Sequence, residues 1–358
     1  MGRMTRTAIT NWRIGWVFLL CGSTSVSSSA QSCSALRSLQ LENTTVTSAR
    51  LVDSGQFVPP PTARRRSPEF FTAFNTLPTF CRVQAVARPS PRSEINIEVW
   101  LPAAGWNKRH LGAGNGSFGG TINYNRLGEA LRRRYASSST DTGHRGKASE
   151  SAWAVNEPEK QADFDYRAIH ETAQTAKGVI HAYYGTAAAW SYFGGCSTGG
   201  RQGLTEAERY PADYDGILAG APARHGFRTS VSGDFAAFQK RGGKIIMYQG
   251  GNDQPEGNLD LFETVRRRLG DETARNLLQF YLFPGVGHCG SGDEPNDFGQ
   301  WLRPGDTPET SLFSALEQWV EQGVRPEGVI ATKFAIDGDP RSAVVKRRRI
   351  CPYPRSGC

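Results

Sequence analysis

Two short segments of this 358-residue chain carry side chains that can act together as a nucleophile and a base. The first, Gly194–Gly200, reads GGCSTGG and places Ser197 at the centre of a Gly-x-Ser-x-Gly pattern. This pattern is typical of a sharp strand-to-helix turn that exposes a Ser hydroxyl. The second segment is Gly287-His288-Cys289. Because a Ser hydroxyl is a weak nucleophile without a neighbouring base, the two segments together predict a serine ester hydrolase.

His288 is better placed than the other histidines to be the base. The six histidines are His110, His144, His170, His181, His225 and His288. His170 and His181 fall within a predicted helix, where a packed or surface histidine is expected, and His144 ends a predicted strand, as a candidate supporting residue. His288 lies in a loop after a predicted strand, and Cys289 beside it can form a disulfide with the cysteine of the first segment. Such a bond tethers the base beside the nucleophile.

The third member of a catalytic triad must accept a hydrogen bond from the imidazole and stabilise its charged form. Asp253 follows the predicted strand Lys244–Tyr248 through a short Gly-Gly-Asn turn, at the sheet edge where ligands bind in open α/β folds. The chain order of nucleophile, acid and base is then the one expected for an α/β-hydrolase. The alternatives are Asp215, which begins a predicted strand, and Asp260, which lies in a predicted helix.

Backbone amides are expected to stabilise the oxyanion of the reaction. The amide of Thr198, directly after the nucleophile, is one candidate donor. The second donor is expected from Gly116 and Ser117, in the segment His110–Gly120 (HLGAGNGSFGG), which begins as a strand and continues into glycine. The alternative for this segment is an ordinary flexible turn.

Alternating strand and helix patterns predict the elements that position these residues. The predicted strands are Ile95–Leu101, the start of His110–Gly120, Tyr135–His144 with its exit loop, Trp190–Phe193, Tyr214–Ala219, Lys244–Tyr248 and Phe280–Phe283. The predicted helices are Asp165–Tyr184, Gly199–Arg209, Leu259–Leu269 and Leu312–Val320. This alternation predicts an α/β fold, with a mostly parallel sheet covered by helices on both faces.

The N-terminal residues 1–30 are predicted to be a secretory signal. A start that contains three Arg precedes the apolar run Ile14–Cys21, and small residues lead to an expected cleavage after Ala30. We therefore expect a secreted protein, extracellular or periplasmic. Two glycosylation acceptor patterns occur, Asn43-Thr44-Thr45 and Asn115-Gly116-Ser117, and the first is the one expected to be exposed.

Six of the seven cysteines remain after removal of the signal, an even number suited to an oxidising compartment. Six cysteines allow fifteen pairings. The expected pairs are Cys33–Cys81, Cys196–Cys289 and Cys351–Cys358. Neither Cys-x-x-Cys nor His-Glu-x-x-His occurs, so no metal site, no metal-dependent hydrolysis and no cofactor are expected.

Composition and charge argue against two classes of partner. The formal net charge is +8, and it falls to +5 when the signal leaves with three Arg and no acidic residue. The basic clusters are scattered and have no interleaved aromatic residues, so they are interpreted as solvated surface and no nucleic acid partner is expected. The one strongly apolar run is too short to span a bilayer, so no membrane association is expected either.

Several of these motifs resemble the tannase and feruloyl esterase family. The resembling segments are Gly195–Gln202 (GCSTGGRQ), Gly287–Cys289, Gly114–Gly116, Ser139–His144 (STDTGH) and Cys351–Pro354 (CPYP), and they extend over almost the whole mature chain. The resemblance implies secreted hydrolysis of aromatic carboxylic esters, such as gallates, hydroxycinnamate esters of plant cell walls or a terephthalate monoester. It also implies the Cys196–Cys289 disulfide and the triad chosen above.

The chain departs from the family pattern in three places. Family members insert a large lid domain, often with bound calcium, where this chain has only the short connection 224–242, so lid and calcium site are expected to be missing. The segment Tyr248–Asp253 (YQGGND) has Gln and Gly where relatives tend to carry His and Trp, and the C-terminal cysteine loop is compressed to Cys351–Cys358. A naturally minimal enzyme and an internally truncated gene model both explain the missing lid.

The expected organisation is a signal at 1–30, an N-terminal arm with a Pro-rich segment at 31–94, and a catalytic α/β-hydrolase domain at 95–358. The expected substrates are small aromatic esters or esters of plant cell-wall polysaccharide. The alternative function is a catalytically impaired, lidless remnant that binds cell-wall phenolics or carbohydrate.

Overall fold

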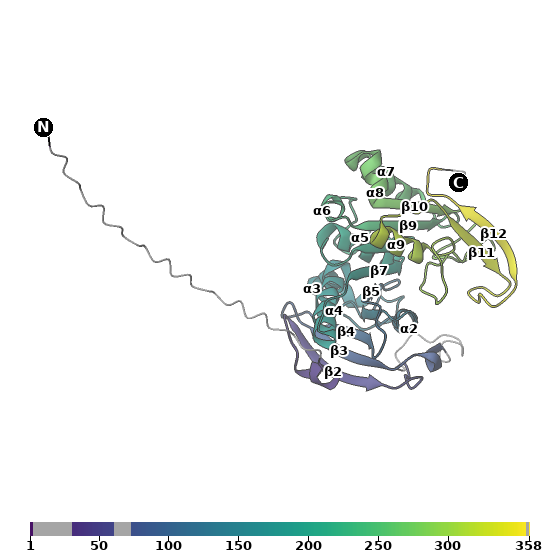
Figure 1. Cartoon of the computed structure of the whole chain (residues 1–358). Coiled ribbons are helices and arrows are strands. Elements are labelled where there is room, and N and C mark those ends of the chain that lie inside the picture. The colour runs from purple at the N-terminus through teal and green to yellow at the C-terminus, as the bar shows by residue number, and fades with distance from the viewer. Residues whose placement is uncertain (3–30, 61–72, 356–357) are drawn as a thin grey trace.

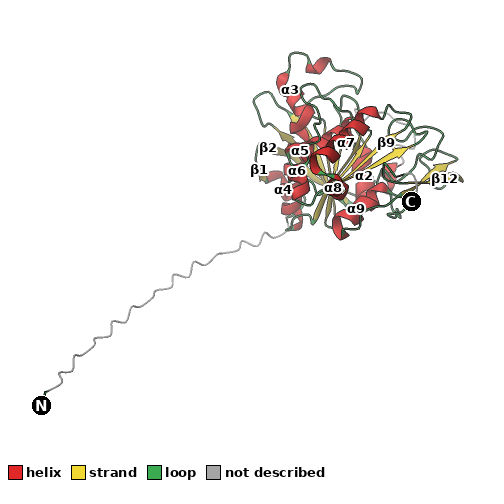
Figure 2. Ribbon diagram, turned by 90° about the horizontal axis from the view of Figure 1, so that it is seen from above, coloured by secondary structure: helices red, strands yellow, loops and turns green. Residues whose placement is uncertain are grey.

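The computed structural model describes residues 1–2, 31–60, 73–355 and 358. Ten strands form one sheet in the order β1-β2-β3-β4-β6-β5-β7-β8-β9-β10, and helices pack on both of its faces (Figures 1 and 2). The predicted α/β-hydrolase class is therefore confirmed. All but the first two residues of the predicted signal, and part of the Pro-rich segment, lie outside the described residues.

Six strands pair in parallel and hold the candidate catalytic segments at their ends. They are β5 (Arg109–Ala113), β6 (Ala136–Thr140), β7 (Trp190–Cys196), β8 (Gly216–Gly220), β9 (Lys244–Gly250) and β10 (Leu278–Phe283). Each predicted strand in this part of the chain is present, with boundaries that move by a few residues. Sequence patterns define element ends less well than element cores, because the last residues of a strand are paired by neighbours far away in the chain.

Residues 31–94 differ from the expected arm, because they contribute strands to the same sheet. The strands β1 (Gln40–Leu41), β2 (Thr44–Val52) and β3 (Phe80–Ala87) continue the sheet by antiparallel pairing onto β4 (Ile95–Pro102), which pairs with β6. The Cys33–Cys81 disulfide joins the short helix η1 (Ser34–Ser38) to β3. Buried and exposed residues alternate over the first four positions of β2, as in a half-buried strand.

Helices divide the hydrophobic core into layers on the two faces of the sheet. The helices are α2 (Tyr124–Arg132), α3 (Pro158–Ala162), α4 (Ala168–Tyr184), α5 (Thr198–Arg209), α6 (Ala236–Lys240), α7 (Glu256–Leu269), α8 (Asp271–Leu277) and α9 (Leu312–Gln322). On β7, Tyr192 packs with residues of α9, whereas its neighbour Phe193 packs with residues of α4, α5 and α7. Successive side chains thus face opposite layers, as the period of a strand requires.

The hairpin of β11 (Val329–Phe334) and β12 (Val344–Ile350) forms a separate two-stranded sheet beside the end of the main sheet (Figure 1). Buried residues of both strands, among them Val329 and Ile350, belong to the same core layer as α9. Among the described residues, none of the helices combines the length and the apolar character needed to cross a membrane.

The strand order creates a crevice at the point where the glycine-rich segment and Ser197 meet. The chain passes from β5 to β6 on one side and later returns to place β7 on the other side of β5. Open α/β sheets bind ligands at such a switch point, outside the carboxyl ends of the strands. The segment after β5 and the turn after β7 both leave the sheet at this place.

Candidate active site

Ser197 occupies a strained turn between β7 and α5. Its backbone has φ +63° and ψ −121°, a conformation that costs a non-glycine residue about 1–3 kcal/mol. Hydrogen bonds hold the turn: the Ser197 N–H donates to the Gly220 carbonyl at 2.9 Å, and its own carbonyl accepts the Arg201 and Ala223 N–H groups at 3.0 and 3.1 Å. The expected sharp turn is therefore present, and it leaves the Ser197 side chain only half-buried.

Two positions of the motif must be glycine because neighbouring backbone segments leave no room for a side chain. A Cβ atom on Gly195 would lie 2.7 Å from the Gly199 Cα, and one on Gly199 would lie 2.7 Å from the Asn115 carbonyl oxygen. Both distances are shorter than real Cβ contacts allow. The strand, the helix and the segment after β5 can therefore meet only where side chains are absent.

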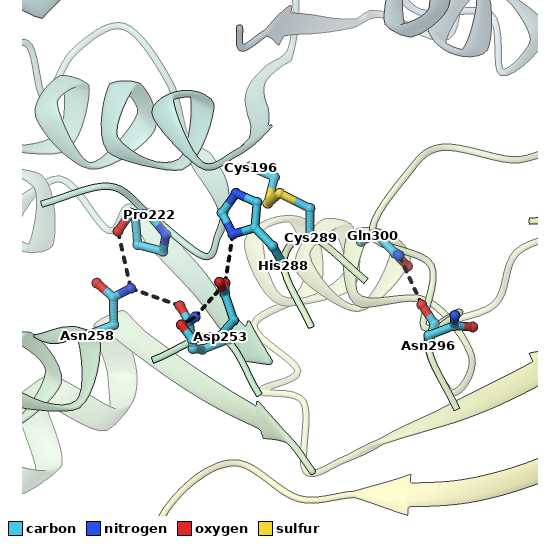
Figure 3. Close-up of a disulfide and its surroundings, with 9 residues drawn as sticks. Cys196, Pro222, Asp253, Asn258, His288, Cys289, Asn296 and Gln300 are labelled. Atoms are coloured by element: carbon cyan, nitrogen blue, oxygen red, sulfur yellow. Dashed lines mark hydrogen bonds and ion pairs between the residues drawn. A yellow bond between two sulfur atoms is a disulfide. The ribbon is translucent and has the colours of Figure 1, made fainter. Parts of the chain in front are cut away.

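The Cys196–Cys289 disulfide joins the turn of Ser197 to the loop of His288. Its Cα atoms are 5.9 Å apart, and it is one of the three disulfides of the structure, which have the pairings expected from the sequence. Figure 3 shows the His288 ring between this disulfide and Asp253. Ser197 and His288 line one cavity of about 350 Å³, together with Gly116 and Ser117. The Ser197 hydroxyl has no hydrogen-bond partner among the described residues, His288 included.

Asp253 is the carboxylate that reaches His288. The His288 Nδ1–H donates to Asp253 Oδ2 at 2.7 Å, which leaves the Nε2 atom as the nitrogen that can accept a proton (Figure 3). The His288 side chain is 52% exposed and the Asp253 side chain 22% exposed, so the pair is open to solvent on the cavity side. This arrangement can orient a general base.

Gln249, at the end of β9, supports Asp253 and was not predicted as a functional residue. Its Nε2 atom donates to Asp253 Oδ2 at 2.8 Å, and its Oε1 atom accepts from Asn258 Nδ2 at 2.8 Å. Asn258 in turn donates to the Pro222 carbonyl at 3.1 Å. The available sequence signal was a glutamine in an otherwise apolar strand, because a buried amide needs hydrogen-bond partners.

The residues expected at the oxyanion lie together beside Ser197. Thr198 is the first residue of α5, and its hydroxyl donates to the Ser117 carbonyl at 2.6 Å. The amides of a first helical turn have no acceptor within the helix and are free to bind an anion. The N–H of Gly116 likewise has no acceptor among the described residues, whereas the N–H of Asn115 is engaged by Gln202 Oε1 at 2.9 Å.

Asn115 serves the site as a structural residue. It is buried, and its Nδ2 atom donates to the carbonyls of Thr140 at 2.8 Å and Thr121 at 3.1 Å. A glycan needs an exposed acceptor, so this position does not suit glycosylation in the folded chain. Asn43, the other acceptor pattern, is exposed.

The other histidines lie in surroundings that differ from a catalytic base. His110 is fully buried on β5, where burial lowers its pKa to about 3. His144 is 6% exposed and stacks on Trp153, and burial lowers its pKa to about 4. His170 donates toward Asp213 rather than toward the cavity.

The two alternative aspartates also lie elsewhere. Asp215 Oδ2 accepts the Ser191 N–H at 2.8 Å, near the start of β7, which is the opposite end of the strand from Ser197. Asp260 is an exposed residue of α7.

A cation and an aromatic ring that sequence patterns did not single out also line the cavity. Arg126 of α2 stacks on Trp301, with its Cζ atom 3.2 Å from the centre of a Trp301 ring. The two residues lie far apart in the chain and carry no shared motif, so only the fold brings them to the site. They form a flat wall that can accommodate a planar group.

The short connection 224–242 is anchored by a buried carboxylate. The Asp165 carboxylate is buried in a π-helical turn (Asp163–Arg167) and accepts the N–H groups of Phe227, Arg228 and Thr229 at 2.9, 2.7 and 3.1 Å. The guanidinium of Arg201, at 3.8 Å, balances its charge. The Asp165 carboxylate thus fixes the part of the connection from Phe227 to Thr229.

Comparisons with known proteins agree with the geometry. The sequence model of the family described as "Tannase and feruloyl esterase" matches residues 81–231 and 225–357, two stretches that meet inside the short connection. An uncharacterized esterase of Xanthomonas campestris pv. campestris is 42% identical over 520 residues, with 92% of this chain and 88% of the relative covered. A probable feruloyl esterase B-1 of Aspergillus fumigatus is 34% identical, with 89% and 90% covered.

Solved structures show the same fold at lower identity. Feruloyl esterase B from Aspergillus oryzae superposes with a TM-score of 0.79 at 21% identity, over 90% of this chain and 95% of that one. Tannin acyl hydrolase from Aspergillus niger superposes with a TM-score of 0.65 at 15% identity, over 88% and 90%. The family match extends over most of the chain and the Xanthomonas esterase is aligned along nearly its whole length, so this chain belongs to the tannase and feruloyl esterase family.

Proposed function

We propose that this protein is a secreted serine carboxylic ester hydrolase that cleaves aromatic esters through an acyl-enzyme. The observation that carries the proposal is the Cys196–Cys289 disulfide, because it places Ser197 and the Asp253-paired His288 on one cavity. The names of the relatives support an esterase. The leader expected at the N-terminus supports secretion.

In the first half of the reaction, the Ser197 oxygen attacks the ester carbonyl while His288 Nε2 takes the hydroxyl proton. The Asp253 carboxylate stabilises the imidazolium that results. The negative oxygen of the tetrahedral intermediate accepts hydrogen bonds from the amides of Thr198 and Gly116. His288 then gives its proton to the leaving alcohol, and the carbonyl–alcohol bond breaks to leave an acyl group on Ser197.

In the second half, a water molecule attacks the acyl group and His288 takes its proton. The tetrahedral intermediate collapses, the bond to Ser197 breaks, and His288 returns the proton to the Ser197 oxygen. The free carboxylic acid leaves. The strained backbone at Ser197 and its hydrogen bonds keep the nucleophile in place through both steps.

The proposed acyl groups are hydroxycinnamoyl or galloyl, on small esters or on plant cell-wall polysaccharide. Trp301, stacked with Arg126, offers a planar wall for an aromatic acid. The alignment with the Xanthomonas esterase extends over 520 residues, and the chain has 358, so at least 162 positions of that alignment have no residue here. We propose that a lid is among the missing parts. The acid-binding cavity is then open, and small activated esters are accepted broadly.

The test is release of ferulate, gallate and acetate from simple esters by the purified protein, with Ser197→Ala as the control. The wild type is expected to release all three acids, and the variant none above the uncatalysed rate. Equal rates in both proteins contradict the serine mechanism. If the cavity is open as proposed, kcat/KM for feruloyl and acetyl esters should differ by less than about tenfold, which corresponds to about 1.4 kcal/mol. A sharp preference for feruloyl esters contradicts the open cavity.

A further inference from the structure

Three side chains outside the active site form a cluster with the composition of a cation site. His170 lies on α4, Glu206 on α5, and Asp213 in the turn before β8. Each offers one ligand atom, an imidazole nitrogen or a carboxylate oxygen, and these atoms all lie within 4.8 Å of one another. Sequence patterns gave His170 a packing or surface role and did not single out the two carboxylates.

Glu206 is the unusual member, because its buried carboxyl group has no hydrogen-bond donor among the described residues. The residue is 1% exposed, and neither of its carboxylate oxygens has a hydrogen-bond donor among the described residues. Burial of a carboxylate without a donor or a counter-charge costs several kcal/mol. A cation or a proton is therefore needed next to Glu206, and the position of Glu206 in the cluster places it beside Asp213 and His170.

Asp213 is by contrast already surrounded by donors. It is 2% exposed, and its oxygens accept from His170 Nδ1 at 2.6 Å, from Gln174 Nε2 at 2.6 Å and from Lys177 Nζ at 3.4 Å. Lys177 is thus the one ammonium group in contact with the cluster among the described residues. One ammonium group balances one of the two carboxylates, so one negative charge remains for a cation or a proton.

The geometry of His170 favours a metal ion over a simple monovalent cation. Its ring stacks on Tyr210 with centres 3.9 Å apart, and this holds Nδ1 toward the carboxylates. The His170 side chain is 29% exposed, which provides access from solvent to an otherwise buried site. One imidazole nitrogen and two carboxylates are a ligand set that suits Zn²⁺ or Mn²⁺, whereas Ca²⁺ and Mg²⁺ prefer oxygen ligands alone.

We propose that His170, Glu206 and Asp213 bind a divalent transition-metal ion, which displaces the proton of His170 Nδ1 to solvent and ties α4, α5 and the turn before β8 together. The ion has a structural role, since the cluster is separate from the cavity of Ser197. Its ligand Glu206 belongs to the helix that begins directly after Ser197, so bound metal rigidifies the element that supports the nucleophile. The site also differs from the calcium site expected in the lid of the family.

The test uses the full chain without a histidine tag, stripped with a chelator, and Zn²⁺ and Co²⁺ as probes. We expect one ion per chain by elemental analysis, a higher melting temperature with Zn²⁺, and visible absorption of Co²⁺ bound to nitrogen and oxygen ligands. His170→Gln and Glu206→Gln are each expected to weaken binding by about tenfold or more. His181→Gln is the matched control, because His181 is an exposed histidine of the same helix.

The same variants separate a metal ion from a proton on Glu206. A protonated Glu206 predicts that Glu206→Gln keeps the melting temperature of the wild type and that neither Zn²⁺ nor chelator changes either protein. That result overturns the proposal, as does Zn²⁺ binding that His181→Gln weakens as much as His170→Gln. If Glu206→Gln fails to fold, His170→Gln decides the matter, because its side chain is partly exposed and the substitution leaves the buried carboxylates in place.

Discussion

One amide nitrogen of Gln249 binds Asp253 twice: it donates to the carboxylate oxygen Oδ2 at 2.8 Å and to the backbone carbonyl at 2.7 Å. The same Oδ2 atom accepts the proton of His288 Nδ1. Gln249 is 2% exposed, and Asn258 holds its other amide atom, so its position is well determined. The side chain therefore sets the direction in which Asp253 presents its carboxylate to His288.

Gln249→Met is expected to lower kcat about ten- to hundredfold with little change in KM, because a hydrogen bond to a charged group is worth about 1.5–3 kcal/mol. Gln279→Met is the matched control: this glutamine is also buried, but it donates to the Arg275 carbonyl in another part of the chain. Equal losses in the two variants would indicate a general loss of structure.

Asp253→Asn should lower kcat by about 10³–10⁴-fold, since the amide favours the wrong tautomer of His288 and leaves the imidazolium without a counter-charge. KM should change little, because Asp253 does not contact the ester. Asp260→Asn, on the exposed side of α7, is expected to keep full activity. Steady-state kinetics on one ester checks both variants, and an active Asp253→Asn enzyme would falsify the proposed triad.

Removal of the Cys196–Cys289 disulfide by alanine substitution of both residues is expected to cost both stability and activity. The bond links residues 93 positions apart, for which the chain-entropy model gives about 4–5 kcal/mol. The Cys351–Cys358 bond links residues 7 positions apart, and the same model gives about 2–3 kcal/mol. Guanidinium unfolding should rank the two double variants in this order. Only the first should lower kcat, because only that bond tethers the loop of His288.

Gly195→Ala is expected to destabilise the fold by about 2 kcal/mol or more and to reduce activity, since the new methyl group meets the backbone of Gly199 at 2.7 Å. Gly257→Ala is the contrasting control. Its Cβ has no neighbour closer than 3.9 Å and lies in α7, so it should stabilise the protein by up to about 1 kcal/mol. Thermal unfolding of the two variants gives opposite signs if the packing around Gly195 is as described.

The lowered pKa of His144 predicts that the folded protein loses stability in mild acid. Burial lowers its pKa in the folded state to about 4, below the ordinary value of 6.5, so the unfolded chain binds more protons between these two values. The free energy of unfolding should therefore fall as the pH drops from 6.5 toward 4, by on the order of 3 kcal/mol for this group. His110 acts in the same direction, so the difference between wild type and His144→Gln isolates His144. Parallel pH curves for the two proteins would contradict the assignment.

Much of the catalytic site was predictable because it is encoded locally. The glycines around Ser197, the cysteines beside Ser197 and His288, and the turn that leads to Asp253 are short motifs. Each has the residue types that its own backbone geometry requires. The alternation of apolar residues likewise defines the strands and helices, because periodicity reflects the face that each element buries.

The supporting parts of the site depended on the tertiary structure. In the sequence, Gln249 is only a departure from the family pattern, and its role is visible only from its hydrogen bond to Asp253 in the structure. Arg126 contacts Trp301 because α2 and the loop after β10 lie side by side in the fold. The cluster of His170, Glu206 and Asp213 forms in the same way from three elements. Residues 31–94 were expected as an arm, whereas strand pairing makes β1, β2 and β3 of this range part of the sheet.

The sequence by itself therefore indicated the class of fold, the proposed nucleophile and its proposed partners, and the cysteine pairs that the structure contains. Only the tertiary structure decided which distant side chains stand within hydrogen-bond distance of one another. The physical reason is the distance along the chain over which each effect acts. Periodicity and turn chemistry depend on residues that are close in the sequence. The pairing of buried polar groups depends on which elements become neighbours when the whole core forms.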